Sequence, residues 1–180
     1  MVFFTGTGDA GETGLLGKER ISKASLRIEV IGCLDETNAT LGIVRSVTQS
    51  KEIQKIILEI QSLLYKLMTE VAATEENAKK FVSIKEEHIL QVEQMINQFS
   101  EKVEIPKEFI VPGDTTGGAF ISFARTQIRK SERKMTELYE KEEIKNIQLI
   151  RFLNRLSSLF FVLELYENKI SGLGNQTLVK

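Results

Sequence analysis

Residues 149–165 read LIRFLNRLSSLFFVLEL, and no other stretch says more about the architecture of the chain. Apolar side chains cover nearly the whole circumference of the helix that this stretch would form, so neighbours must surround it. It is therefore the central helix of a bundle or part of a subunit interface. We expect the helix to run from about Ile144 to Ile170 and to end before Gly172.

Four further segments carry apolar residues at helical spacing, approximately residues 27–50, 51–73, 84–99 and 116–140. Ser83 is expected to cap the third of them, with Glu86 completing a Ser-x-x-Glu capping box. Pro106 and Pro112 bracket an extended connector before the fourth. The predicted fold class is all-α, a five-helix bundle with a Gly-rich N-terminal loop.

Length and composition limit the class of protein. The 180 residues suit a single domain, with residues 1–24 as a loop and residues 25–171 as the helical bundle. A net charge of -1 disfavours a nucleic-acid-binding surface. No apolar run is long enough for a membrane span, and the first residues do not resemble a secretory signal. The single cysteine, Cys33, fits a reducing compartment, so we expect a cytoplasmic protein.

Residues 5–14, TGTGDAGETG, form a loop dense in glycines and hydroxyl groups. Such a loop can direct several backbone N–H groups and hydroxyls to one phosphate. Three of its glycines match G-x-G-x-x-G, but we reject a dinucleotide fold because no clear strand precedes the loop and no parallel sheet follows. The Walker pattern also fails, since Glu12 and Glu19 occupy positions that need Gly and Ser or Thr. On composition alone, a mobile terminal loop is an equally good interpretation.

The helix expected at residues 116–140 carries a stripe of charge. Arg125, Arg129, Glu132 and Arg133 lie at i, i+4, i+7 and i+8, so they share one face. Guanidinium groups on such a stripe match an anion with several oxygens. For this helix alone, a solvated face held by ion pairs is the simpler interpretation.

Two polar residues are expected on otherwise apolar faces, Asp35 and Asn154. A buried carboxylate needs a cation and a buried amide needs partners. Asp35 could pair with an arginine of the fourth helix, or the pair could serve packing specificity only. His88 is the only histidine, which excludes a multi-His metal site and weakens any Ser–His–Asp triad.

Three separated blocks together resemble the cob(I)alamin adenosyltransferases of the propanediol-utilisation (PduO) type. Members of that family transfer the 5′-deoxyadenosyl group of ATP to the cobalt of cob(I)alamin, forming adenosylcobalamin and releasing triphosphate. The blocks span nearly the whole chain in the family's order. They are residues 5–15 with Lys23, Arg27 and Glu29 and then residues 32–38; residues 109–113 and 124–133; and residues 152–157.

The resemblance implies a ferritin-like five-helix bundle that assembles as a homotrimer, with ATP between adjacent subunits. It implies that the N-terminal loop wraps the triphosphate and that the fourth and fifth helices complete the nucleotide site. Mg²⁺ would be held mainly by the phosphates, with Glu132 as the candidate protein ligand. The implied nucleotide-binding residues are Thr5, Gly6, Thr7, Gly8, Thr13, Gly14, Lys23, Arg129, Lys130, Ser131, Glu132, Arg133 and Asn154.

The catalytic residues implied by the resemblance are Asp35, Arg125, Phe109 and Arg129. Asp35 and Arg125 would form an ion pair beside the corrin. Phe109 would close the lower face of the corrin and displace its axial base, so that a biological reductant can supply an electron to the cobalt. Arg129, with Lys23 and Mg²⁺, would stabilise the departing triphosphate. A reductase and a B12-dependent enzyme are the implied protein partners.

Four residues depart from the family's pattern: Gly6 stands for Lys or Arg, Lys130 for Arg, Asp114 for Gly and Ser158 for Asp. We expect the first to remove one phosphate contact. Two other functions therefore stay open. One is a carrier or interaction module that binds adenosylcobalamin and ATP with weak catalysis, and the other is a structural bundle with a solvated arginine face.

Overall fold

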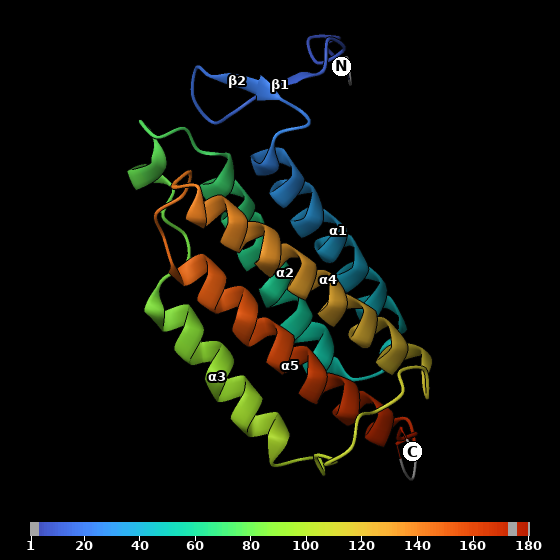
Figure 1. The fold of residues 1–180 in the computed structure, drawn as a ribbon. Helices are drawn as coiled ribbons and strands as arrows, with labels where there is room; N and C mark the ends of the chain where they lie inside the picture. Colours follow the sequence, from blue (N-terminus) through green and yellow to red (C-terminus); the bar gives the residue numbers. More distant parts are fainter. Residues whose placement is uncertain (1–3, 173–175, 180) are drawn as a thin grey trace.

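The computed structural model describes residues 4–172 and 176–179, and it confirms the five-helix bundle (Figure 1). Central helix α5 packs against α3 and α4, α4 also packs against α1, and α1 packs against α2. No helix in the described part of the chain is long and apolar enough to cross a membrane. The helices are α1 (Leu26–Val47), α2 (Lys51–Ala72), α3 (Glu86–Ser100), α4 (Thr116–Glu140) and α5 (Gln148–Ile170).

The core forms around α5, as its all-round apolar sequence predicts. Phe152, Leu156 and Phe160 are completely buried, and the core cluster contains residues of every helix. Fully burying one such side chain contributes on the order of 1.5–3 kcal/mol. Cys33 is also buried and free.

Helix starts follow the capping rules in three cases. The side chains of Ser25, Ser50 and Thr115 accept hydrogen bonds from the first turns of α1, α2 and α4. The predicted capping box at Ser83 is wrong. The backbone N–H and the hydroxyl of Ser83 both donate to the carboxylate of Glu70 at 2.7 Å, so this residue satisfies a buried group of α2.

Two other helix boundaries differ from the predictions. α3 begins at Glu86, and the backbone N–H of its N-cap residue Lys85 donates to His88 Nδ1 at 3.1 Å. α5 begins at Gln148, four residues later than predicted. The preceding turn contains Glu142 with φ of 58°, and Asn146 Oδ1 accepts from the first helical N–H at 3.1 Å.

A short hairpin, absent from the sequence prediction, projects from the end of the bundle where α1 begins (Figure 1). Strands β1 (Glu12–Gly14) and β2 (Arg20–Ser22) are antiparallel. The turn between them docks on the end of α2, where the Leu16 N–H donates to the Ala72 carbonyl at 2.8 Å. Strands of three residues are too short to give a detectable alternation of apolar and polar residues. A 3₁₀ turn, η1 (Ala78–Lys80), lies between α2 and α3.

The connector that precedes α4 pairs with the end of the chain. The Val111 N–H donates to the Thr177 carbonyl and the Val179 N–H to the Phe109 carbonyl, both at 2.8 Å. Asp114 accepts from the Thr177 hydroxyl at 2.6 Å and from its N–H at 2.9 Å. These hydrogen bonds hold the pKa of Asp114 below its usual value. The segment that carries Phe109 is therefore fixed by residues far away in sequence.

We predict that Gly118→Ala destabilises the protein. A Cβ at Gly118 would meet Asn168 Oδ1 and approach Thr115 Oγ1, and Asn168 is buried and already accepts from that hydroxyl at 2.6 Å. We expect a loss of about 1–3 kcal/mol in the free energy of unfolding, because overpacking outweighs the roughly 1 kcal/mol that alanine gains in a helix. The matched control is Gly32→Ala on α1, where the Cβ meets open space and should stabilise. Equal stability of the two variants in urea denaturation would refute this packing argument.

Candidate functional site

The N-terminal loop is a series of hydrogen-bonded turns. The Asp9 N–H donates to the Gly6 carbonyl at 3.1 Å, and the Gly11 N–H donates to the Gly8 carbonyl at 3.2 Å. Gly6 and Gly11 have φ of 69° and 83°, a backbone conformation that favours glycine. The turns give this loop a defined shape, which a mobile terminal segment would lack.

Side chains around the loop bring hydroxyls and a cation together. The hydroxyls of Thr5 and Thr7 lie 2.8 Å apart and both residues are exposed. Lys23 Nζ donates to the Gly8 carbonyl at 2.7 Å, so its ammonium lies over the same turn. Thr13 and Gly14, the other predicted loop residues, lie next to this turn on β1. The predicted loop residues therefore gather around one surface.

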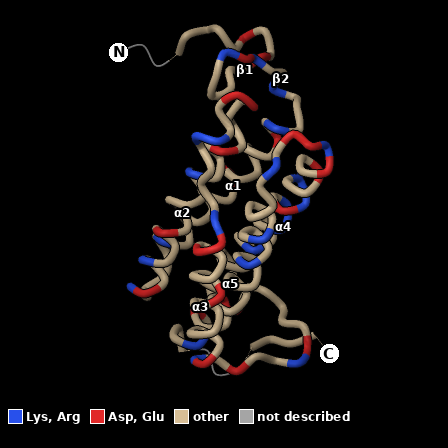
Figure 2. Tube along the Cα trace, turned by 90° about the vertical axis from the view of Figure 1, so that its left-hand side faces the viewer, with Lys and Arg blue, Asp and Glu red and all other residues tan. Residues whose placement is uncertain are grey.

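Arg129 and Arg133 lie on α4, where several basic positions follow one another (Figure 2). Both are exposed, and neither takes part in an ion pair among the residues that the structure describes. Lys130 differs, because Glu36 lies 3.1 Å from its ammonium and raises its pKa. The interpretation as a face held by ion pairs therefore does not apply to these two arginines.

Glu132 and Asn154 meet between α4 and α5. Asn154 Nδ2 donates to Glu132 Oε1 at 2.9 Å, and Asn154 Oδ1 accepts from Arg155 Nη1 at 2.9 Å. Both Glu132 and Asn154 are half-buried. The amide thus has the partners that its position predicts, and a carboxylate is fixed beside the arginine stripe.

Ser131 lies on a different face of α4. It is completely buried, its hydroxyl donates to the Gln127 carbonyl at 3.0 Å, and Thr37 of α1 lies 3.4 Å away. The Ser131 side chain therefore packs within the α1–α4 interface, and its role in nucleotide binding stays a prediction.

The expectation that Asp35 lies on an apolar face is wrong. Its side chain is exposed, because the buried face of α1 follows Val30, Leu34 and Leu41. No ion pair joins Asp35 to Arg125 in the described part of the chain. Each step of one residue turns a helix by about 100°, which places Asp35 beside that face and not on it.

Arg125 has an acidic neighbour on α5 that the sequence analysis missed. Glu164 is buried, which raises its pKa, and the Ser122 hydroxyl and the Arg125 guanidinium partly oppose that rise. Arg125 Nε and Glu164 Oε2 are both buried without a hydrogen-bond partner in the described structure. Glu164 lies within the apolar stretch 149–165, where a carboxylate indicates that a cation is buried beside it.

Phe109 is 85% exposed and stands on the connector that the end of the chain holds. The start of α4, which follows this connector, forms a shallow surface depression with a volume of about 340 Å³. The residues that line this depression are Gly113, Thr115, Thr116, Ala119, Phe120 and Phe123.

Among the described residues, no group of three or more His, Cys, Asp or Glu side chains could hold a metal ion.

Exposed guanidinium groups and a glycine-threonine loop, which lie on the same helical bundle, both suit an anion with several oxygens. The chain matches the family model described as cobalamin adenosyltransferase over residues 3–167. It therefore belongs to the cobalamin adenosyltransferase family, which confirms the resemblance found in the sequence.

Several relatives support this membership. The chain is 34% identical to the corrinoid adenosyltransferase PduO of Salmonella typhimurium over 164 residues, which cover 91% of the chain and 48% of that protein. It thus spans about half the length of that relative and of its Citrobacter freundii counterpart. It is 33% identical to the corrinoid adenosyltransferase of Bacillus subtilis, covering 97% of this chain and 91% of the relative.

Solved structures agree with the fold. A variant of the PduO-type ATP:corrinoid adenosyltransferase of Lactobacillus reuteri, complexed with cobalamin and ATP, superposes with a TM-score of 0.92 at 28% identity. The match covers 99% of this chain and 97% of that chain. A second variant of the same protein, complexed with ATP, gives a TM-score of 0.91.

Proposed function

We propose that this protein is an ATP:corrinoid adenosyltransferase, which transfers the 5′-deoxyadenosyl group of ATP to the cobalt of cob(I)alamin. The observation that carries the proposal is a pair of exposed arginines, Arg129 and Arg133, beside the Glu132–Asn154 contact. Neither arginine has an ion-pair partner within residues 4–172 and 176–179. Two guanidinium groups one helical turn apart suit a triphosphate. Family membership supplies the class of substrate.

We infer that ATP binds between subunits of a homotrimer. Within one chain, no hydrogen bond or ion pair among the described residues joins residues 4–14 to α4. The loop and the arginines thus each offer half of a phosphate site. A cyclic trimer would bring the loop of one subunit to α4 of the next.

In the proposed reaction, the cobalt of cob(I)alamin attacks the 5′ carbon of ATP with its electron pair. The bond between the 5′ carbon and oxygen breaks, and that electron pair leaves with triphosphate. Arg129 and Lys23 would stabilise the developing negative charge. Holding the carbon in line with the cobalt is a proximity effect. No proton transfer is needed, which suits a chain with one histidine.

Phe109 and the depression beside the start of α4 are proposed to receive the corrin. The ring of Phe109 would exclude water and the axial base from the lower face of the corrin, so that the cobalt accepts an electron more easily. Asp35 and Arg125 are proposed to lie beside the corrin. Because they are not paired in one chain, that ion pair needs Asp35 of a neighbouring subunit or a movement of Arg125 away from Glu164.

Mg²⁺ would reach the site with the triphosphate, and Glu132 is its candidate protein ligand because a carboxylate oxygen is a suitable donor. Its second oxygen is not engaged by Asn154. A reductase would supply the electron for cob(II)alamin, and a B12-dependent enzyme would use the product. We keep the cytoplasm as the proposed location, which a single free cysteine suits.

The direct experiment mixes the protein with ATP, Mg²⁺ and reduced cobalamin and follows the absorbance change of cobalt alkylation. We expect turnover and release of triphosphate. Binding of ATP and adenosylcobalamin without transfer would favour the carrier function, for which Gly6 is the best argument. Absence of nucleotide binding would leave a structural bundle.

A further inference from the structure

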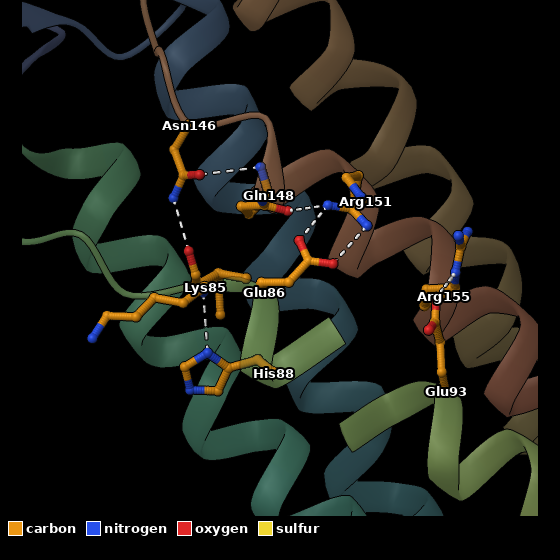
Figure 3. Close-up of polar contacts among 9 residues, drawn as sticks. Lys85, Glu86, His88, Glu93, Asn146, Gln148, Arg151 and Arg155 are labelled. Carbon is orange, nitrogen blue, oxygen red and sulfur yellow. Dashed lines mark hydrogen bonds and ion pairs between the residues drawn. The ribbon is translucent and has the colours of Figure 1, made fainter. Parts of the chain in front are cut away.

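A chain of side-chain contacts runs from α3 through α5 to the nucleotide site on α4. Arg155 Nε donates to Glu93 Oε1 at 2.7 Å, and Arg155 Nη1 donates to Asn154 Oδ1 at 2.9 Å. Asn154 Nδ2 then donates to Glu132 Oε1 at 2.9 Å. Figure 3 shows the first contact, which joins α3 to α5.

The chemistry of these groups allows only one arrangement of the chain of contacts. A guanidinium only donates hydrogen bonds, and an ionised carboxylate only accepts them. The side-chain amide of asparagine has an oxygen that accepts and an NH₂ group that donates. With Arg155 on one side, the oxygen of the Asn154 amide must face it, so the NH₂ group faces Glu132. If the amide flipped, both contacts would become repulsive.

The same contacts keep Glu132 away from the arginines. Arg129 and Glu132 stand at i and i+3, a spacing at which opposite charges pair on a helix. No such ion pair is present among the described residues, and Glu132 is held by Asn154 instead. Arg129 therefore keeps its guanidinium for an external anion.

We propose that Glu93 and Arg155 are positioning residues of the nucleotide site, which fix Asn154 so that it holds Glu132 and leaves Arg129 unpaired. The inference rests on the proposed function, since it assigns these residues to ATP binding. It extends the site to α3, a helix that carries none of the predicted site residues.

The chain supplies a matched control on the same two helices. Glu86 of α3 and Arg151 of α5 form an ion pair with contacts of 2.5 and 2.9 Å, and this pair does not touch Asn154 (Figure 3). The arginine and glutamate side chains are 39% and 51% exposed, against 37% for both Arg155 and Glu93. A merely structural role predicts that breaking either pair has the same consequences.

The experiment compares Arg155→Met and Glu93→Gln with Arg151→Met and Glu86→Gln. We expect all four to change Tm equally little, because both pairs are partly exposed. Arg155→Met should weaken ATP binding by about tenfold in calorimetry and raise the KM for ATP, with the corrinoid KM unchanged. Arg155→Lys should restore part of the affinity, while the control variants should bind ATP like the wild type. Equal ATP affinity in the Arg155 and Arg151 variants would overturn the proposal.

A measurement without ATP separates this inference from the proposed function. The NMR signals of the Asn154 side-chain amide should shift in Arg155→Met and stay in place in Glu86→Gln. If the wild type binds no ATP, the proposed function and the ATP role of these residues both fail. If ATP binds but the amide signals do not respond to Arg155→Met, only the positioning role fails.

Discussion

Arg129→Ala is expected to lower kcat/KM for ATP by about 10²–10³-fold while the fold survives. The side chain is exposed and has no ion-pair partner among the described residues, so its loss should change the free energy of unfolding by no more than about 0.5 kcal/mol. The effect arises because the guanidinium would meet charge that develops on the departing triphosphate. Steady-state kinetics with reduced cobalamin, together with a thermal melt, measure both quantities.

The matched control for this prediction is Arg45→Ala. Arg45 is exposed in the last turn of α1 and lies outside the proposed site. We expect wild-type kinetics for it. A wild-type rate in the Arg129 variant would remove this residue from the catalytic machinery, and similar losses in both variants would point to a general effect of surface charge.

Phe109→Ala should impair the reaction that starts from cob(II)alamin far more than the reaction that starts from chemically prepared cob(I)alamin. The proposed role of the ring precedes transfer, because it excludes the axial base before the cobalt is reduced. We expect a loss of about 10²-fold in the first assay and less than tenfold in the second. The ring is 85% exposed, so the substitution should leave stability unchanged.

Two control measurements accompany the Phe109→Ala prediction. Tyr65→Ala removes another exposed aromatic ring, on α2, and should leave both assays unchanged. Spectra of bound cob(II)alamin should show loss of the axial base with the wild type and retention of it with the Phe109 variant. Equal losses in the two assays would contradict the proposed role.

The helices could be predicted because their signals are local. Long segments without Pro carry apolar residues at helical spacing, and the stretch that is apolar nearly all round becomes α5 at the centre of the bundle. The prediction of a helix cap failed where the residue forms its hydrogen bonds with a partner far away in sequence. Ser83 bonds to Glu70 on α2 instead of capping α3. The pairing of the Phe109 segment with residues 177–179 had no local signal and was not predicted.

The candidate site shows the same division between local and distant signals. Spacing alone placed Arg129 and Arg133 on one exposed face, and the rule that a buried amide needs partners anticipated the contacts of Asn154. No local pattern links Arg155 to Glu93, which lies 62 residues away. Asp35 was misplaced because the periodicity of α1 defines its buried face only to within about one residue.

Mixed trimers test the central claim, that the loop of one subunit meets α4 of the next around ATP. Lys23→Ala damages the loop half and Arg129→Ala damages the helix half, so each homotrimer should be nearly inactive. Coexpressed subunits with two affinity tags give trimers that contain both variants. If the claim holds, one of the three sites in each such trimer pairs an intact loop with an intact helix, and activity rises to about one third of wild type. If the site lies within one subunit, every site keeps one defect and the mixture stays as inactive as its parents.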